Sequence, residues 1–196
     1  MAPTEEDNFF RQDLIQDVVH DPMAAFYGGV AGNAGLFSNA NDLAVVLQMN
    51  LQNGYYGDKR HLQEGVVQAF VKKSFKDNRR GLGWDKPDKH NAPPTASAHA
   101  SADSYGHSGF TGTAVWVDPQ YDLIYVFLSN RAYPDVTNNR LSKKKGRCED
   151  PRRGVRGHYG PVRRYIKSCY ATNAIVQLFH HQMVNARMHK PRNTYF

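Results

Sequence analysis

The chain has 196 residues, of which 40% are hydrophobic and 12% aromatic, and its formal net charge is +7. This length suffices for one domain with a hydrophobic core, and the apolar content excludes a chain that is disordered by composition. No apolar run approaches the roughly 18 to 20 residues that a membrane-spanning helix needs, so we expect a soluble globular protein without a membrane span.

The charge is unevenly distributed along the chain. Residues 1–139 hold 11 Lys or Arg against 16 Asp or Glu, whereas residues 140–196 hold 14 against 2, so the two net charges are −5 and +12. Such a break marks the last part of the chain as a different kind of sequence. The acidic start MAPTEEDNFF has no basic segment followed by an apolar stretch, so we expect no secretory signal. Either the protein is cytoplasmic or Met1 is not its natural start.

The first half of the chain predicts a glycine loop and two helices. The loop GGVAGNAG, residues 28–35, lacks the buried strand and the lysine of a phosphate-binding loop, so we expect backbone packed on backbone. A helix is expected over about 40–53, with Asn39 as its N-cap. Its apolar positions recur at helical spacing: Leu43, Val46, Leu47 and Leu51. A shorter helix is expected in LQEGVVQAFVKKS, residues 62–74, despite Gly65.

The next segments predict a sheet. GLGWDKPD indicates a short strand broken by Gly and Pro, and residues 91–104 form a loop rich in Pro, Ala and Ser. GTAVWVDPQYDLIYVFLSN has two β-rich runs around Asp118-Pro119, which predicts a hairpin. Its second run, Leu123 to Leu128, is nearly all apolar, as in a strand covered on both faces. The expected fold class is therefore α/β of the α+β type, an antiparallel sheet flanked by helices.

The sequence changes character after Asn139. Residues 142–164 contain few large apolar side chains and could not anchor a core. The following stretch, YIKSCYATNAIVQLFHHQMVNA at 165–186, restores helical spacing and predicts a helix. The two cysteines, Cys148 and Cys169, are too few for a disulfide framework.

Among the nine histidines, His107 has neighbours that suggest chemistry. On a strand that begins Gly106-His107-Ser108-Gly109, His107 and Gly109 share one face, and the glycine leaves room for a ligand along the strand. A backbone N–H there could donate to a developing oxyanion. The alternative is a glycine-rich bend that opens an ordinary strand. Zinc-ligand spacing is absent from the other cluster of this residue type, His180, His181 and His189, so we expect no metal site.

Four blocks in a fixed order resemble the C-terminal half of the β-lactamase-related serine hydrolases, which include class C β-lactamases, D-alanyl-D-alanine carboxypeptidases and related esterases. The blocks are APTEEDNFFR, VHDPMAAFYGGVAGNAGLFSNANDLA, RRGLGWDKP and SYGHSGFTGTAVWVDPQYDLIYVFLSNR. The resemblance covers about residues 2–141 and implies a partial β-lactamase/transpeptidase-like fold. One departure is Asn33, where relatives commonly have His.

The resemblance implies roles for four residues. His107-Ser108-Gly109 matches the His-x-Gly form of the third active-site motif, so His107 would help to hold substrate and the charge pattern of the site. The N–H of Phe110 would be one half of an oxyanion hole. The Ser-x-x-Lys nucleophile and the motif tyrosine of the family lie upstream of these blocks. The one Ser with Lys three residues later is Ser142, in a basic run that we reject as the nucleophile.

The leading hypothesis is therefore a fragment of a serine hydrolase that acts on a small amide or ester, of the β-lactam or D-Ala peptide kind, and is nearly inert alone. No cofactor and no metal is implied. One alternative is a non-catalytic module that binds a peptide or glycan near His107. Nucleic-acid binding by the basic tail is the lesser alternative. The family is mostly periplasmic or extracellular, which leaves the compartment of this chain open.

Two parts of the chain are expected. Residues 1–141 would be the C-terminal portion of a β-lactamase-like domain, and residues 142–196 an atypical basic tail. The tail is either an out-of-frame reading, which we favour, or a genuine extension that contacts nucleic acid or anionic surfaces. A truncated sheet would expose an unpaired edge, so we expect association through that edge.

Overall fold

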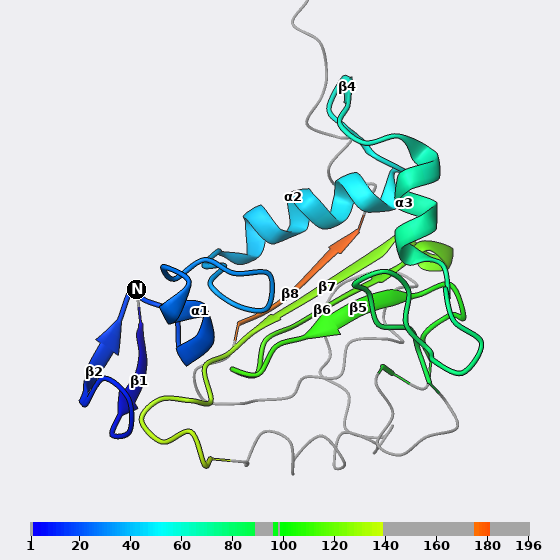
Figure 1. Ribbon diagram of the computed structural model, residues 1–196. Coiled ribbons are helices and arrows are strands. Elements are labelled where there is room, and N and C mark those ends of the chain that lie inside the picture. The colour runs from blue at the N-terminus through cyan, green and yellow to red at the C-terminus, as the bar shows by residue number, and fades with distance from the viewer. Residues whose placement is uncertain (1, 89–95, 98, 139–174, 181–196) are drawn as a thin grey trace, which may run out of the picture. The chain divides into compact units, whose positions relative to one another are not determined.

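The computed structural model describes residues 2–88, 96–97, 99–138 and 175–180 (Figure 1). They form two compact units. The first unit contains residues 2–38, 109–113, 128–138 and 175, and the second contains residues 39–88, 96–97, 99–108, 114–127 and 176–180. Both are built from short helices and small antiparallel sheets. Within these described ranges no helix is long and apolar enough to cross a membrane.

The first unit opens with an antiparallel hairpin that the sequence analysis missed. Strand β1 spans Pro3–Asp7 and pairs with β2, Asp13–Gln16. The Asp7 carboxylate closes the turn, because it accepts hydrogen bonds from the N–H groups of Phe9, Phe10 and Arg11 at 2.8–3.0 Å. These bonds, with that from Phe10 the strongest, hold the pKa of Asp7 well below its usual range.

A short helix and the glycine loop follow. Helix α1, Pro22–Phe26, was also missed; it is capped by Asp21, whose carboxylate accepts from the N–H of Ala24 at 2.7 Å. The expectation of a tight glycine loop is confirmed at Gly35, which has φ +113°, because a side chain there would collide with the backbone of Gly29. Asn33 donates to the Asp21 carboxylate at 3.2 Å, so the residue that departs from the family pattern joins the loop to the cap.

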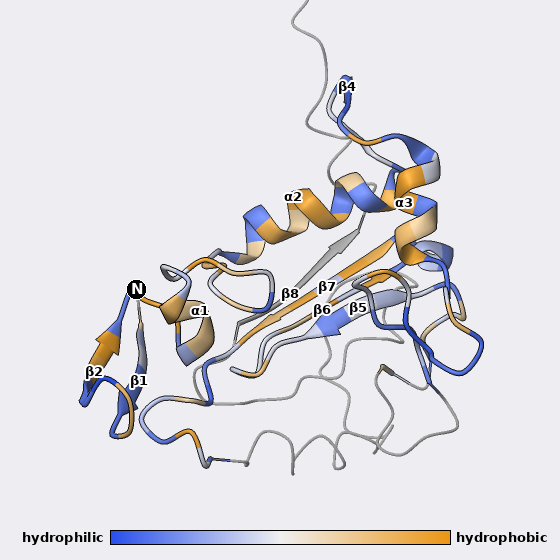
Figure 2. Ribbon diagram, viewed as in Figure 1, coloured by the Kyte–Doolittle hydropathy of each residue, from blue (hydrophilic) through white to orange (hydrophobic). Residues whose placement is uncertain are grey.

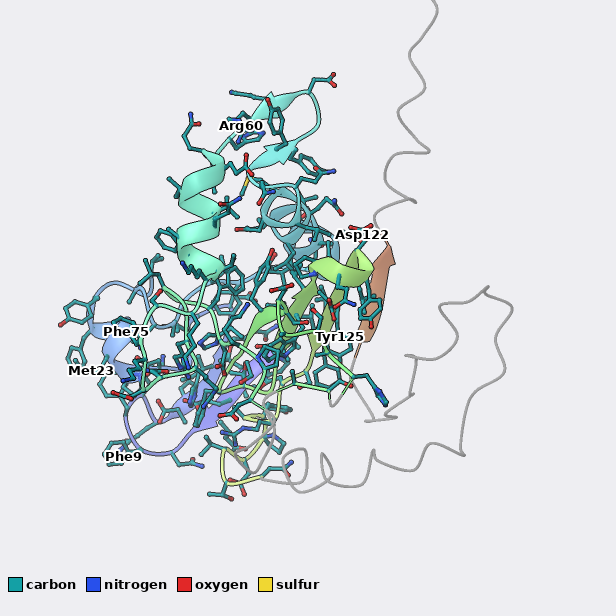
Figure 3. All side chains as sticks on the ribbon, turned by 90° about the vertical axis from the view of Figure 1, so that its right-hand side faces the viewer. Phe9, Met23, Arg60, Phe75, Asp122 and Tyr125 are labelled. Carbon is teal, nitrogen blue, oxygen red and sulfur yellow. The ribbon has the colours of Figure 1, made fainter. Side chains whose placement is uncertain are left out.

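Several large apolar side chains of the first unit are exposed to solvent. Figure 3 shows Phe9 and Met23 projecting from this unit, and their exposed fractions are 90% and 57%. Other members of this apolar surface are Phe26, Val30 and Leu36. Surfaces of this kind are typical of a face that another polypeptide covers. Association therefore stays a prediction of the sequence analysis.

The second unit contains a four-stranded sheet in the order β5-β6-β7-β8. The strands are β5 Tyr105–Ser108, β6 Ala114–Asp118, β7 Leu123–Leu128 and β8 Ile175–His180. The predicted hairpin around Asp118-Pro119 is confirmed: β6 and β7 are antiparallel with Trp116 opposite Tyr125. Asp118 caps the connecting 3₁₀ turn by accepting from the N–H of Gln120 at 3.2 Å.

The apolar side chains of this hairpin form the core of the second unit. Val117, Ile124 and Val126 are at most 1% exposed. Figure 2 shows β7 as a strongly hydrophobic segment. The expectation of a strand covered on both faces is met only in part, since Leu123 and Tyr125 alternate with the buried residues and are half-buried.

Strand β8 corrects the helix expected over residues 165–186. Residues Ile175–His180 are a strand beside β7, and the remainder of that segment lies outside the described residues. The letters IVQLFH carry β-branched and aromatic residues, which favour a strand when a neighbouring strand offers backbone partners. The pairing available at the edge of β7 therefore outweighs the helical spacing of the apolar residues.

Both predicted helices are present, with shifted bounds. Helix α2 spans Ala40–Leu51, and the predicted N-cap Asn39 accepts from the N–H groups of Asn41 and Asp42 at 3.0 Å. Helix α3 spans Glu64–Val71. Between them lies a small hairpin of β3, Tyr55–Tyr56, and β4, Lys59–Arg60. Figure 1 shows α2 running along one face of the sheet.

The buried stripe of α2 differs from the predicted one. Its buried residues are Ala40, Ala44, Leu47 and Gln48. Val46, expected on the buried face, is 51% exposed. The buried face of α2 is therefore rotated away from Val46.

Candidate functional site

The third-motif strand β5 lies at the end of the sheet, paired on one side with β6. On its outer side, Gly106 exchanges two backbone hydrogen bonds with Asp85, of 2.7 and 3.0 Å. The GLGWDKPD segment, expected as a broken strand, thus supplies a single bridge to β5. A side chain at Gly106 would collide with the carbonyl of Val115 and the ring of Trp116, so only glycine fits there.

His107 is exposed and makes two contacts through its ring. Its Nδ1 lies 2.9 Å from the carbonyl oxygen of Ser108, and its Nε2 lies 3.3 Å from a terminal nitrogen of Arg80. A guanidinium group can only donate, so Nε2 is the acceptor and the ring proton is on Nδ1, which donates to Ser108. The electron pair of Nε2 is therefore directed at the guanidinium group of Arg80.

An ion pair fixes the loop that carries Arg80. The side chain of its neighbour Arg79 donates to both carboxylate oxygens of Asp85, at 2.6 and 3.0 Å. Asp85 is buried, and its hydrogen bonds with Arg79 raise the pKa of the guanidinium. The same residue therefore anchors the arginine loop by its side chain and β5 by its backbone.

Gly109 and Phe110 lie in a turn rather than on the strand. The strand ends at Ser108, so the expectation that Gly109 shares a strand face with His107 is wrong. The N–H of Gly112 donates to the carbonyl of Gly109 at 3.0 Å, which makes residues 109–112 a β-turn with Phe110 as its second residue. Gly112, at φ +98°, supplies the left-handed backbone that ends the turn.

This turn fixes the direction of the Phe110 N–H. The carbonyl of Gly109 and the N–H of Phe110 belong to one planar trans peptide group, so they point in opposite directions. The bond from Gly112 holds that plane. Nothing in the described part of the chain accepts a hydrogen bond from the Phe110 N–H. It is therefore a preoriented donor with no acceptor in the described residues.

The four predicted site residues are thus divided between the two units. His107 and Ser108 belong to the second, whereas Gly109 and Phe110 belong to the first. Ser142, the rejected nucleophile, lies outside the described residues. The described residues include no group of three or more His, Cys, Asp or Glu side chains that could hold a metal ion. Sequence reasoning missed Arg80, although the block RRGLGWDKP contains it, because its contact with His107 spans 27 residues.

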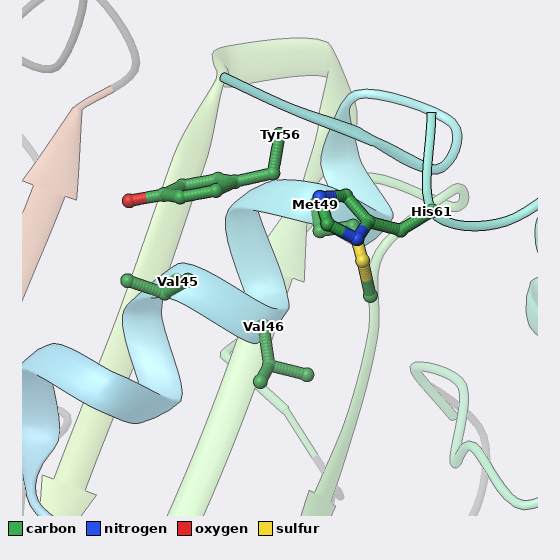
Figure 4. A pocket seen from close by; sticks show the side chains of 5 residues that line it. All are labelled: Val45, Val46, Met49, Tyr56 and His61. Atoms are coloured by element: carbon green, nitrogen blue, oxygen red, sulfur yellow. The ribbon is translucent and has the colours of Figure 1, made fainter. Parts of the chain in front are cut away.

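A separate apolar pocket of about 210 Å³ lies in the second unit. Figure 4 shows Val45, Val46 and Met49 on α2, with Tyr56 and His61 completing the lining. Its polar groups are the two ring nitrogens of His61 and the hydroxyl of Tyr56, and none of the four predicted site residues lines it.

Comparison with known proteins identifies the family of the chain. The sequence profile of the family described as Beta-lactamase matches residues 4–145. Proteins named "Putative D-alanyl-D-alanine carboxypeptidase" from Salmonella gallinarum, Salmonella paratyphi B and Salmonella newport are each 37% identical to this chain over 133 residues. The alignment covers 67% of this chain and 31% of each relative, so the chain spans about a third of their length. The chain belongs to the Beta-lactamase family.

Proposed function

We propose that this chain supplies the third-motif wall of a serine hydrolase that transfers an acyl group from an amide or ester to water. The observation that carries the proposal is the Phe110 N–H, which is held in direction by a β-turn and directly follows the His-Ser-Gly motif. The substrate would be a β-lactam, as the family description suggests, or a peptide ending in D-Ala, as the names of the relatives suggest.

The proposed role of Phe110 is electrostatic. When a nucleophile attacks a carbonyl, negative charge develops on its oxygen, and a donor already aimed at that position lowers the barrier without reorganising. A turn held by its own hydrogen bond meets this requirement. Losing one such donor typically costs about 10²- to 10³-fold in rate.

His107 would contribute through its contact with Arg80. Its Nε2 accepts from Arg80, and the guanidinium keeps its other donors for a carboxylate or carbonyl of the substrate. The pair is therefore suited to binding an anionic substrate through the remaining donors of Arg80.

The nucleophile and its base would come from a segment other than residues 1–141. The sequence contains Ser-x-x-Lys once, at Ser142 to Lys145. Without the nucleophile the remaining donors can bind and polarise a carbonyl but cannot form the acyl intermediate. We expect the chain alone to be nearly inert.

The proposal is tested with two proteins. The chain alone is assayed with nitrocefin and a nitrophenyl ester, and a chimera is made in which its aligned 133 residues replace those of the Salmonella gallinarum relative. We expect no turnover by the chain and turnover by the chimera at a rate comparable to the relative. Turnover by the chain that a serine-directed phosphonate abolishes would contradict the proposal, as would a folded chimera that is inert beside an active relative.

The non-catalytic alternative rests on the exposed Arg80–His107 pair. It predicts that the chain alone binds a D-Ala-D-Ala peptide and leaves it uncleaved. Isothermal titration with that peptide, repeated with Arg80→Ala, separates the two functions when it is read beside the chimera.

A further inference from the structure

We propose that His20 and Arg131 are positioning residues that clamp the Phe110 side chain and so hold the turn that carries its N–H. The inference rests on the proposed function for the purpose of that N–H, whereas the clamp itself is a property of the first unit. Neither residue is part of a third active-site motif, and both are far from Phe110 in sequence.

Phe110 is 59% exposed, yet two groups pack against its ring. The imidazole of His20 stacks on it, with a centroid distance of 5.0 Å and an interplanar angle of 6°. The guanidinium carbon of Arg131 lies 4.2 Å from the ring centroid, which is the geometry of a cation–π contact. An exposed phenylalanine without such partners would be free to change rotamer.

Arg131 also binds the backbone of the turn. Its Nε donates to the Phe110 carbonyl at 2.7 Å, and its own N–H donates to the Thr111 carbonyl at 2.8 Å. A terminal nitrogen reaches the carbonyl of Val136 at 2.8 Å, which fixes the guanidinium itself. Because Arg131 donates to the carbonyls of Phe110 and Thr111, the two peptide groups that follow Phe110 in the chain cannot rotate without losing these bonds.

His20 is held from its other side by a carboxylate. Its Nδ1 pairs with the carboxylate of Glu5, a buried residue. Arg11 pairs with the same carboxylate and donates to the carbonyls of Val19 and His20 at 2.6 and 2.7 Å. The histidine ring is therefore fixed by the β1–β2 hairpin, and the hairpin sets where the Phe110 ring can lie.

The β1–β2 hairpin also contacts the segment that carries Arg131. Asn130 donates to the carbonyls of Pro3 and Thr4 at 2.8 and 2.9 Å, so β1 is tied to the segment that carries Arg131. Both halves of the clamp thus depend on one small hairpin. The hairpin therefore supports the β-turn at residues 109–112, which carries the Phe110 N–H.

The clamp is tested on the full chain by ¹⁵N NMR, through heteronuclear NOE values and amide exchange at residues 109–113. We expect His20→Ala and Arg131→Ala each to lower the NOE of these residues and to speed exchange of the Gly112 N–H by about two- to fivefold, the scale of one exposed cation–π or aromatic stacking contact. Arg131→Lys keeps a cation but loses the planar guanidinium with its several N–H donors, so it should restore little of the order of the turn. His20→Phe keeps the stacking and should restore most of the order.

The matched control is Arg60→Ala, which removes a cation–π contact of the same 4.2 Å distance, on Tyr55 in the second unit. It should leave residues 109–113 unchanged. Circular dichroism melts identify any variant that has unfolded. If an alanine variant unfolds, the test rests on the conservative variants: the turn should stay ordered in His20→Phe and lose order in Arg131→Lys. Unchanged NOE and exchange values in both alanine variants would overturn the clamp.

The chimera provides the functional readout. We expect Arg131→Ala to lower kcat about tenfold or more with little change in KM, because an oxyanion donor acts in the transition state. If the parent chimera is inert and the turn is disordered in its Arg131→Ala variant, the proposed function is refuted and the clamp is supported. A disordered turn with kcat unchanged would refute the link between them.

Discussion

Replacing Arg79 by Ala should destabilise the second unit by about 1–3 kcal/mol, because it leaves the buried Asp85 carboxylate without its main partner. The two bonds of 2.6 and 3.0 Å would be lost, and one carboxylate oxygen would keep only the N–H of Lys86, at 3.0 Å. The side chain of Arg79 is 35% exposed and that of Asp85 is 9% exposed, so the cost lies below that of a fully buried pair.

The assay is urea unfolding followed by tryptophan fluorescence. Both tryptophans of the chain, Trp84 and Trp116, belong to the second unit, and Trp84 precedes Asp85 directly. With a slope of about 1–3 kcal/mol per molar urea, the midpoint should fall by about 0.3–3 M. The neighbouring Arg80→Ala is the matched control and should shift the stability by less than about 0.5 kcal/mol, because Arg80 is exposed.

Substituting both partners sharpens this prediction. In Arg79→Ala/Asp85→Asn the buried charge is gone. The double variant should therefore lose less stability than the two single variants lose in sum. Equal midpoints for wild type and Arg79→Ala would refute the view that this ion pair anchors the β5 edge.

Three further predictions concern single sites. Gly106→Ala should destabilise the second unit by about 1–3 kcal/mol in the same urea assay, since the new methyl group meets backbone and indole, and a chain of unchanged midpoint would contradict the packing. Asn39→Ala should cost about 0.5–2 kcal/mol through the lost cap of α2, measured against exposed Asn41→Ala. The depressed pKa of Asp7 stabilises the first unit above pH 3.8, the ordinary value of this carboxyl, and that contribution is lost as the pH falls further. Asp7→Asn should therefore make the stability of the first unit less dependent on pH below 3.8, as followed by the NMR signal of Phe10. An unchanged pH dependence would contradict the role of the Asp7 carboxylate in closing the turn.

The elements that the sequence predicted have strong local signals. Asn39 caps α2 as expected, and the Asp118-Pro119 turn joins two strands of the expected composition. The β1–β2 hairpin has no such signal, since its buried residues include Glu5 and Asp7, which are satisfied by Arg11 rather than by an apolar core. Arg11 lies only six and four residues from these carboxylates, but charged residues that are buried by pairing with each other leave no apolar periodicity to detect.

The candidate site divides in the same way. The His-Ser-Gly motif was visible in the sequence, and the structure adds the turn that separates Gly109 from the strand. The partners of the motif were not predictable, because Arg80 reaches His107 across 27 residues and His20 reaches Phe110 only after the chain has folded. For β8, spacing favoured a helix, and only the neighbouring strand explains the extended backbone.

The most direct test of the central proposal compares Phe110→Pro with Phe110→Ala in the chimera. Proline is favoured at the second position of a β-turn and removes the N–H, whereas alanine keeps the N–H and removes the ring. Acylation by a fluorescent penicillin is measured under single-turnover conditions. The account predicts that Phe110→Pro lowers the acylation rate about 10²- to 10³-fold and that Phe110→Ala has a distinctly smaller effect. Equal rates for a folded Phe110→Pro chimera and its parent would contradict the assignment of this N–H to the oxyanion hole.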